Sequence, residues 1–210
     1  MGLISLLFNQ PITFLALVVP LIYSIIAHEV SHGWVAYLFG DDTAQRSGRL
    51  SLNPLSHLEP LGTLMLFVVG FGWAKPVPIN YMKLKNVRAG FILVSLAGCA
   101  ANIFIATVAI FLLHSQIVGA HRFMTLTLLV FARINIMLGA FNLIPIPPLD
   151  GARILMGLLP ARAQRIFSLL EPYGFYILIM LLLTRTLNPV IYFIEKAIVF
   201  VIGALVGYTG

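Results

Sequence analysis

The strongest constraint on the fold is a series of long segments that consist almost entirely of apolar residues. These segments lie at residues 11–39, 90–113, 123–146, 166–184 and 189–206. A helix crosses the hydrocarbon core of a membrane in about 20 such residues. Only 10% of the residues are charged and the mean hydropathy is +1.00, whereas a soluble domain carries about 25% charged residues. The sequence therefore predicts an all-α membrane protein, a polytopic helical bundle of about five spans, and excludes a soluble globular enzyme.

A different kind of element is predicted between the first and second full spans. Residues 62–71 are apolar but too short to cross a membrane, and the segment that follows contains Pro76 and Pro78. Two prolines this close together disfavour a helix and favour extended backbone. At membrane depth such backbone is tolerated only where protein or water covers it. We therefore expect a re-entrant, partly β element here.

The basic residues are gathered in two loops. Residues 40–89 and 148–165 hold nine of the 13 Lys and Arg residues. Because these residues accumulate in cytoplasmic loops, both loops are predicted to face the cytoplasm and the N-terminus to lie outside. The net charge of +6 then reflects topology in a lipid bilayer, and no nucleic-acid partner is expected. The single cysteine, Cys99, excludes an internal disulfide framework and a cysteine-based zinc site.

The first span carries the pattern H-E-x-x-H at His28, Glu29 and His32. Residues four apart share one face of a helix, so the two imidazoles can bind one Zn²⁺ while the glutamate acts as a general base. Ionisable residues inside a membrane are expensive and therefore usually functional. The alternative is a structural cluster of hydrogen-bonded side chains between helices.

A catalytic zinc needs a third protein ligand and an open position for water. Asp150 is a candidate, because it follows a stiff proline-rich run at residues 145–148 and precedes Gly151, which allows close approach. His57 and Glu59 are rival ligands in the first basic loop. Asp41 and Asp42 are expected to be solvated loop charges.

Three further polar residues lie within the apolar segments. Asn135 is expected to make a hydrogen bond between helices, and Glu195 to pair with its neighbour Lys196. Arg133 is expected to reach the membrane surface or to pair with an acid, and a structural and a functional role are equally open.

Several motifs occur together in a fixed order. They are H-E-x-x-H at 28–32, G-D-D-T-A with G-R-L-S-L-N-P-L and G-T-L between 40 and 64, G-W-A-K-P-V-P at 72–78, S-L-A-G-C-A-A-N at 95–102 and N-x-x-P-x-x-x-L-D-G at 142–151. On these motifs the chain resembles the site-2 protease family of intramembrane zinc metalloproteases over roughly its first three quarters. Two departures are Cys99, where the family usually has proline, and Glu59, where it usually has aspartate.

The resemblance implies a function and a set of site residues. The function is a zinc-dependent endopeptidase that hydrolyses peptide bonds within or near the transmembrane segments of membrane-protein substrates. One Zn²⁺ per chain would be held by His28, His32 and Asp150, and Glu29 would activate the water. Substrate contacts are implied for Asn102, Asn142, Gly72, Pro76, Val77 and Pro78, the last four in a re-entrant β element that pairs with an unwound substrate.

The domain organisation follows from the length of 210 residues. We expect a single membrane-embedded metalloprotease domain at 1–210, with a catalytic core at about 11–160 and two accessory spans at about 166–207. It resembles a minimal form without the peptide-binding or nucleotide-sensing domain of many relatives. The expected location is the cytoplasmic membrane of a cell, with the active site towards the cytoplasmic side.

Two other functions compete with proteolysis. The intramembrane ionisable groups could serve a zinc or proton transporter, and an inactive protein could bind membrane helices. The chain shows no internal repeat, and Glu29 stands beside both histidines, as hydrolysis requires. The intact motifs also speak against an inactive protein.

Overall fold

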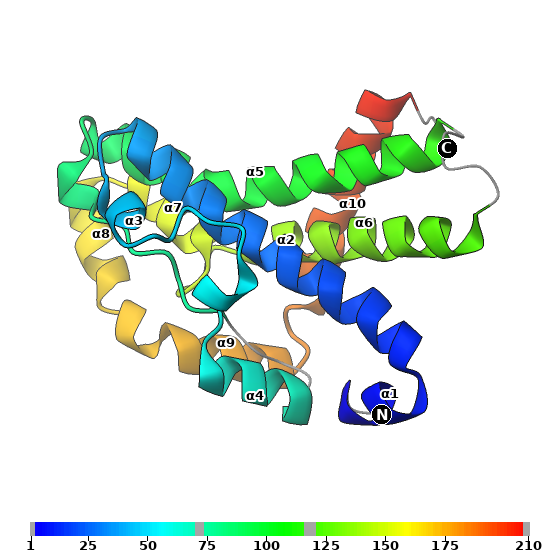
Figure 1. The fold of residues 1–210 in the computed structure, drawn as a ribbon. Coiled ribbons are helices and arrows are strands. Elements are labelled where there is room, and N and C mark those ends of the chain that lie inside the picture. The colour runs from blue at the N-terminus through cyan, green and yellow to red at the C-terminus, as the bar shows by residue number, and fades with distance from the viewer. Residues whose placement is uncertain (1–2, 70–73, 116–120, 208–210) are drawn as a thin grey trace.

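The fold is a bundle of helices (Figure 1), seen in a computed structural model that describes residues 3–69, 74–115 and 121–207. The α-helices are α1 (Leu3–Asn9), α2 (Pro11–Leu38), α3 (Thr43–Arg46), α4 (Pro60–Val69), α5 (Val87–His114), α6 (Arg122–Asn142), α7 (Asp150–Leu158), α8 (Ala161–Ser168), α9 (Gly174–Leu183) and α10 (Asn188–Val206). Three short 3-10 turns are η1 (Pro54–Ser56), η2 (Tyr81–Lys83) and η3 (Glu171–Tyr173).

Four of these helices, α2, α5, α6 and α10, are long and apolar enough to cross a membrane. The prediction of about five spans was wrong for residues 166–184, which form the end of α8, η3 and the ten-residue helix α9. Pro172 lies within this break, and proline cannot donate the backbone hydrogen bond that a continuous helix needs. Over the residues that the structure describes, the protein is therefore an all-helical membrane protein with four candidate spans.

The centre of the bundle combines small residues with isoleucines. Helices α2, α5 and α6 pack on one another, α10 packs on α5 and α6, and α7 packs on α5. One core cluster joins α5, α6 and α10 through Ala106, Ile136, Ala140, Ile198 and Ile202. Small side chains let helix backbones approach closely, which is how helices associate in membranes.

The β part of the predicted re-entrant element is not supported. Helix α4 is short, as expected, and residues 74–80 are extended, but within the described residues they form no strand. Their backbone groups bind side chains of the chain itself, as shown below, so no neighbouring strand is needed. Gly72 lies outside the described residues.

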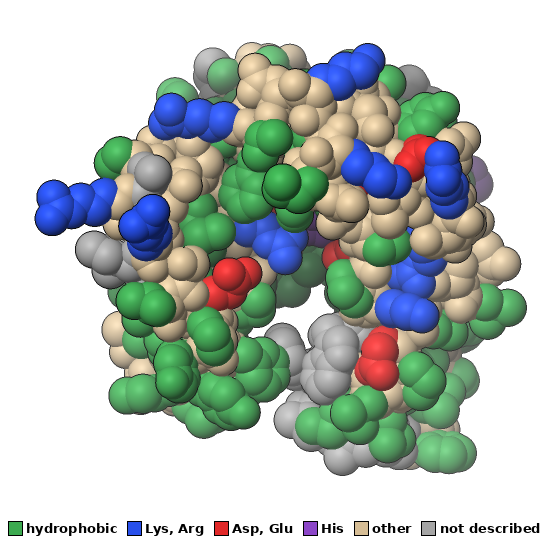
Figure 2. Space-filling model, turned by 90° about the vertical axis from the view of Figure 1, so that its left-hand side faces the viewer, with side chains coloured by type: hydrophobic (Ala, Val, Ile, Leu, Met, Phe, Trp, Pro, Cys, Tyr) green, Lys and Arg blue, Asp and Glu red, His purple; other side chains and the backbone are tan. Residues whose placement is uncertain are grey.

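Charge and apolar surface are separated on the face at the α3, α7 and α8 end of the molecule. Figure 2 shows Lys and Arg side chains over much of the upper part of this face and apolar side chains along its lower part, with a hollow between them. Exposed apolar residues are also common along the long helices, for example Phe104, Phe111 and Phe200. Such a surface suits contact with lipid rather than with water.

Candidate metal centre

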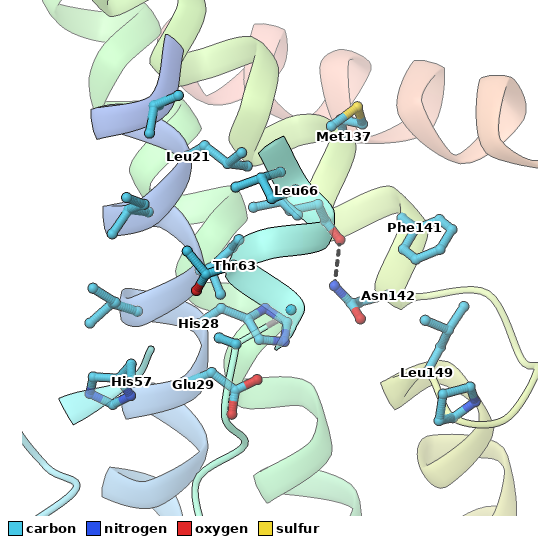
Figure 3. Close-up of a pocket in the computed structure, with 18 of the residues that line it drawn as sticks. Leu21, His28, Glu29, His57, Thr63, Leu66, Met137, Phe141, Asn142 and Leu149 are labelled. Carbon is cyan, nitrogen blue, oxygen red and sulfur yellow. Dashed lines mark hydrogen bonds between the residues drawn. The ribbon is translucent and has the colours of Figure 1, made fainter. Parts of the chain in front are cut away.

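A cavity of about 780 Å³ lies between α2 and α4 on one side and α6, α9 and α10 on the other. Its wall is mostly apolar and includes Leu21, Leu66, Met137 and Phe141 (Figure 3). His28 and Glu29 of α2 and Asn142 of α6 line one end of it, and Figure 3 shows them on opposite sides of the space. A mostly apolar cavity with a few polar groups at one end is the usual form of a binding site.

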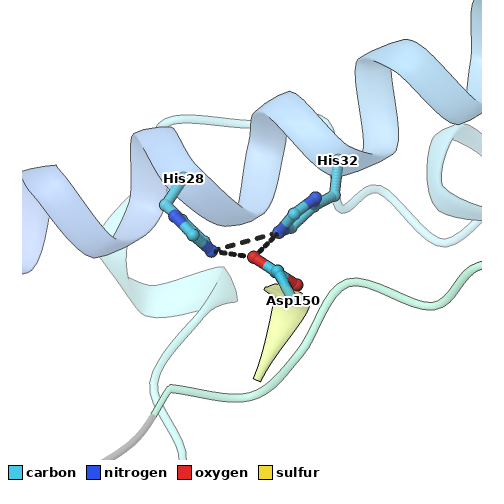
Figure 4. A group of neighbouring side chains, drawn as sticks. All are labelled: His28, His32 and Asp150. Carbon is cyan, nitrogen blue, oxygen red and sulfur yellow. Dashed lines mark hydrogen bonds and ion pairs between the residues drawn. The ribbon is translucent and has the colours of Figure 1, made fainter. Parts of the chain in front are cut away.

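Three potential metal ligands converge at this end. His28 Nε2 and His32 Nε2 lie 3.0 and 3.1 Å from Asp150 Oδ2, and the two nitrogens are 3.1 Å apart (Figure 4). The two histidines are one helical turn apart on α2, and Asp150 is the first residue of α7. All three are almost completely buried. The structure thus brings together the three residues that the resemblance implied as ligands.

The ring orientation of both histidines leaves Nε2 free to bind a metal. His32 Nδ1 lies 2.6 Å from the carbonyl oxygen of Val94, which can only accept, so Nδ1 carries the proton. His28 Nδ1 lies 2.6 Å from Asn102 Oδ1 and donates to it in the same way. Each Nε2 therefore presents a lone pair to the centre of the group, as metal-binding histidines do.

Asn102 is itself fixed by a buried polar network. Its Nδ2 donates to Asn135 Oδ1 at 2.8 Å and to the Ser24 carbonyl at 3.3 Å, while Asn135 Nδ2 donates to Ser24 Oγ at 2.8 Å. Asn102, Asn135 and Ser24 are fully buried. The expected hydrogen bond of Asn135 between helices is confirmed. The structure places Asn102 behind His28, and its contact with substrate stays a prediction.

The group fits zinc. Two lone pairs and a carboxylate oxygen face one another at close range, and Asp150 Oδ2 is buried without a hydrogen bond, an arrangement that repels unless a cation lies among the three atoms. In a tetrahedral site with bonds of about 2.0–2.1 Å, ligand atoms lie about 3.3 Å apart. The observed separations of 3.0–3.1 Å are close to this value.

Two glycines make room for the ligands. A methyl group at Gly98 of α5 would lie 2.5 Å from His28 Nε2 and 2.6 Å from His32 Nε2. A methyl group at Gly151 would lie 2.2 Å from the carbonyl oxygen of Leu143. The close approach expected at Gly151 is therefore confirmed, whereas no sequence pattern indicated why residue 98 must be glycine.

Glu29 is oriented by the extended segment at 74–80. Its Oε2 accepts a hydrogen bond from the backbone N–H of Val77 at 3.0 Å. The buried guanidinium of Arg49 donates to the carbonyls of Lys75 and Pro76. Arg49 therefore fixes the segment that holds Glu29. It lies in one of the motifs noted above, but its function could not be inferred from the sequence.

Asp41 also holds this segment, and its interpretation as a solvated charge was wrong. Asp41 is fully buried, and its Oδ2 accepts from the backbone N–H of Asn80 at 2.6 Å. Asp42 does face solvent. The hydrogen bond from Lys83, together with the charge of Arg46, holds the pKa of Asp42 below its usual range.

The rival ligands lie outside the metal group. His57 lines the cavity and its Nε2 donates to the Ser51 carbonyl at 2.7 Å, while Glu59 accepts from the backbone N–H of Gly62 at the start of α4. The expected pairing of Glu195 with Lys196 was wrong: Arg133 Nη1 donates to Glu195 Oε2 at 3.0 Å, and the Lys196 amine lies over the Tyr192 ring.

The comparisons with known proteins agree with this centre. The model of the family described as Peptidase family M50 matches residues 114–184. The chain is 41% identical over 179 residues to "Putative zinc metalloprotease YwhC" of Bacillus subtilis (strain 168), covering 80% of each chain. It is 31% identical over 183 residues to "Putative zinc metalloprotease Rip2" of Mycolicibacterium smegmatis, covering 83% of this chain and 69% of that one. No solved structure matches the chain significantly.

Proposed function

Since this chain belongs to peptidase family M50, the site-2 protease family, and is therefore a zinc metallopeptidase, we propose that it cleaves membrane proteins within or near their transmembrane segments. The observation that carries the proposal is the position of the metal group. His28, His32 and Asp150 lie at one end of a mostly apolar cavity whose walls are membrane-spanning and short apolar helices. A substrate that reaches this centre along the cavity would itself be apolar.

The chemistry follows from the side chains at that end. His28, His32 and Asp150 would hold a zinc ion, which would act as a Lewis acid towards the attacking water and the substrate carbonyl. Glu29, held at Oε2 by the N–H of Val77, takes a proton from the attacking water and delivers it to the amine that leaves when the peptide bond breaks. Asp150 has no proton to give and serves as a ligand only.

The substrate must present an unwound backbone at this point, because a helix hides its peptide bonds in its own hydrogen bonds. We place Asn142 against the scissile carbonyl, since its side chain lines the cavity opposite Glu29. Pro76, Val77 and Pro78 are proposed to lie beside the unwound substrate by strand addition. The N–H of Val77 is already used by Glu29, the carbonyl of Pro76 accepts from Arg49, and the two prolines have no N–H, so within 76–78 the carbonyls of Val77 and Pro78 are the groups proposed to meet a substrate.

The orientation is inferred from the charges. Most Lys and Arg residues lie at the end of the molecule that carries α3, α7 and α8 (Figure 2). By the positive-inside rule this end faces the cytoplasm. In a cytoplasmic membrane the active site would then lie towards the cytoplasmic side and the N-terminus outside.

The decisive experiment is cleavage of a panel of single-span membrane proteins by purified protein. Wild type, Glu29→Gln and wild type treated with a zinc chelator are compared, with zinc content measured in each. We expect cleavage by wild type alone, while Glu29→Gln keeps its zinc. Cleavage that survives in Glu29→Gln, or zinc-bound wild type that cleaves soluble proteins but no membrane protein, would contradict the proposal. Zinc or proton flux into vesicles unaffected by Glu29→Gln would favour the transporter instead.

A further inference from the structure

The wall of the cavity also carries an ion pair between two of the candidate spans. Arg133 of α6 donates to Glu195 of α10 at 3.0 Å, and both side chains line the cavity. The Glu195 side chain is only 11% exposed, whereas that of Arg133 is 65% exposed. The acid is thus mostly buried against its partner, whereas most of the Arg133 side chain is exposed.

Arg133 has hydrogen-bond donors to spare. A guanidinium has five N–H groups. Within the described part of the chain, Arg133 makes a single hydrogen bond, to Glu195. Around it the wall is mainly apolar, formed by residues such as Met137 and Ile191. Unpaired donors in such surroundings are expensive, so a partner from outside the chain would be stabilised there.

A lipid headgroup is too far away to be that partner. Arg133 lies 11 residues after the start of α6 and nine before its end. At 1.5 Å per residue this puts it about 13–16 Å from either end of the helix, near the middle of a hydrocarbon core about 30 Å thick. The partner must therefore be a group that itself lies within the membrane, such as a side chain of a bound transmembrane segment.

The ion pair selects the chemistry of that side chain. Arg133 and Glu195 together are neutral and present donors beside an acceptor. A carboxamide matches both, since its oxygen accepts from a guanidinium while its N–H₂ donates to a carboxylate. An extra carboxylate would leave a net negative charge next to Glu195, and an extra ammonium would face Arg133, and either is costly in a membrane.

The spacing between the two polar ends of the cavity fixes where this side chain must lie. Arg133 and Asn142 are nine residues apart on α6, which is about 13 Å. Leu138 and Phe141 on this wall, and Leu21 and Ile25 on the opposite one, offer no hydrogen bonds. A substrate must therefore keep its helical hydrogen bonds along this stretch, and a helix covers the same distance in about nine residues.

We propose that Arg133 and Glu195 form a specificity site that recognises an Asn or Gln side chain in the substrate's transmembrane helix, about nine residues from the scissile bond. This inference rests on the proposed function, because it concerns the substrate of the same cavity. The ion pair thereby selects among transmembrane segments that the apolar wall alone would not distinguish.

The test uses a single-span substrate that the wild-type protein cleaves. One Asn is moved through positions three to 13 residues from the cut, and at each position a twin carries Leu. The enzymes are wild type, Arg133→Leu/Glu195→Leu and the control Arg122→Leu, which removes a positive charge at the start of the same helix. The double variant leaves neither charge buried alone, and its zinc content and melting temperature are measured beside those of wild type.

We expect wild type to cleave the Asn substrate about three to ten times more efficiently than its Leu twin when Asn is near position nine, the size of one or two hydrogen bonds between helices. Arg122→Leu should keep this ratio, and the double variant should bring it to one while cleaving the Leu twin as wild type does. Two results with wild type would overturn the inference: a ratio of one at every position, or a ratio that peaks near position four. With the double variant, an unchanged ratio or an equal slowing of the Asn substrate and its Leu twin would overturn it as well. Zinc-bound wild type that cleaves no membrane substrate would instead overturn the proposed function.

Discussion

The two sides of the cavity are built in opposite ways. Around the metal group, α2 and α7 pack closely on α5, His28 and His32 are held through their Nδ1 atoms, and His28, His32 and Asp150 are almost completely buried. Away from the metal group, α4 and α9, which have ten residues each, contribute apolar side chains such as Leu66, Phe175 and Leu178 to the cavity wall. The side chains that would take part in peptide-bond hydrolysis are thus held in fixed positions. The part of the wall that would contact different substrates is an apolar surface.

This difference predicts a gradient of mutational effects. Residues that hold the metal ligands should be intolerant of a single added methyl group, because packed interiors have no space to give. Residues that connect the metal side to the extended segment at 74–80 should affect the rate but not the metal. Residues on the apolar wall should affect mainly which substrates bind.

The largest effect is expected from Gly98→Ala. The added methyl group would lie 2.5 Å from His28 Nε2 and 2.6 Å from His32 Nε2, where a zinc ion and its ligands must fit. We expect loss of most bound zinc and a fall in peptidase activity of at least about 100-fold, since both depend on those nitrogens. Zinc content by atomic absorption and substrate cleavage check this.

Gly139→Ala is the matched control. Gly139 is also buried on a spanning helix, but there the methyl group meets its nearest neighbour, Ile103 Cγ1, at 3.5 Å, an ordinary contact. It should keep full zinc and most of its activity. If Gly98→Ala also kept its zinc, the region around the metal ligands would not be packed so tightly that it excludes one methyl group, and the prediction would be wrong.

Part of this site was readable from the sequence and part was not. His28, Glu29 and His32 follow from helix geometry alone, because residues four apart share a face. From the residues alone Asp150 was one candidate among several, since nothing in helix periodicity links α7 to α2, and the family resemblance singled it out as a ligand. Gly98 lies in the motif at 95–102, but the sequence did not indicate its function, which is to leave space for two side chains of another helix.

The fold, like the site, was predictable from the sequence only in part. The spans at α2, α5, α6 and α10 follow from apolar length. The predicted span at 166–184 failed because apolar content conceals a broken helix, although Pro172 was a visible signal. The β element is not supported because a strand needs a partner, and here Arg49, Glu29 and Asp41 bind several of the backbone groups that a partner strand within the chain would use.

A smaller effect is expected from Arg49→Met, which breaks the connection between the two regions. Without its guanidinium, the carbonyls of Lys75 and Pro76 lose their donor, and the N–H of Val77 no longer holds Glu29 in place. We expect kcat to fall by about tenfold, in the range of other orienting partners of a metal site, with zinc content unchanged. The control is Arg46→Met, which removes an exposed ion pair with Asp42 and should change kcat less than about twofold. Equal effects of the two variants would mean that Arg49 does not orient the general base.

The smallest effect on the enzyme itself is expected from Leu66→Ala, on the apolar wall. Leu66 of α4 lines the cavity and is only half-buried, so its truncation opens space that a substrate or lipid fills without leaving a sealed void. We expect bound zinc and kcat to stay within about twofold of wild type, while KM rises about two- to fivefold for substrates with large apolar side chains, because only uniform binding is lost. Kinetics in proteoliposomes with Leu-rich and Ala-rich transmembrane substrates measure this, and the Ala-rich substrate should be little affected. A fall in kcat with zinc retained would place α4 among the elements that orient the reacting groups, and the contrast between a fixed metal side and a substrate-fitting wall would then fail.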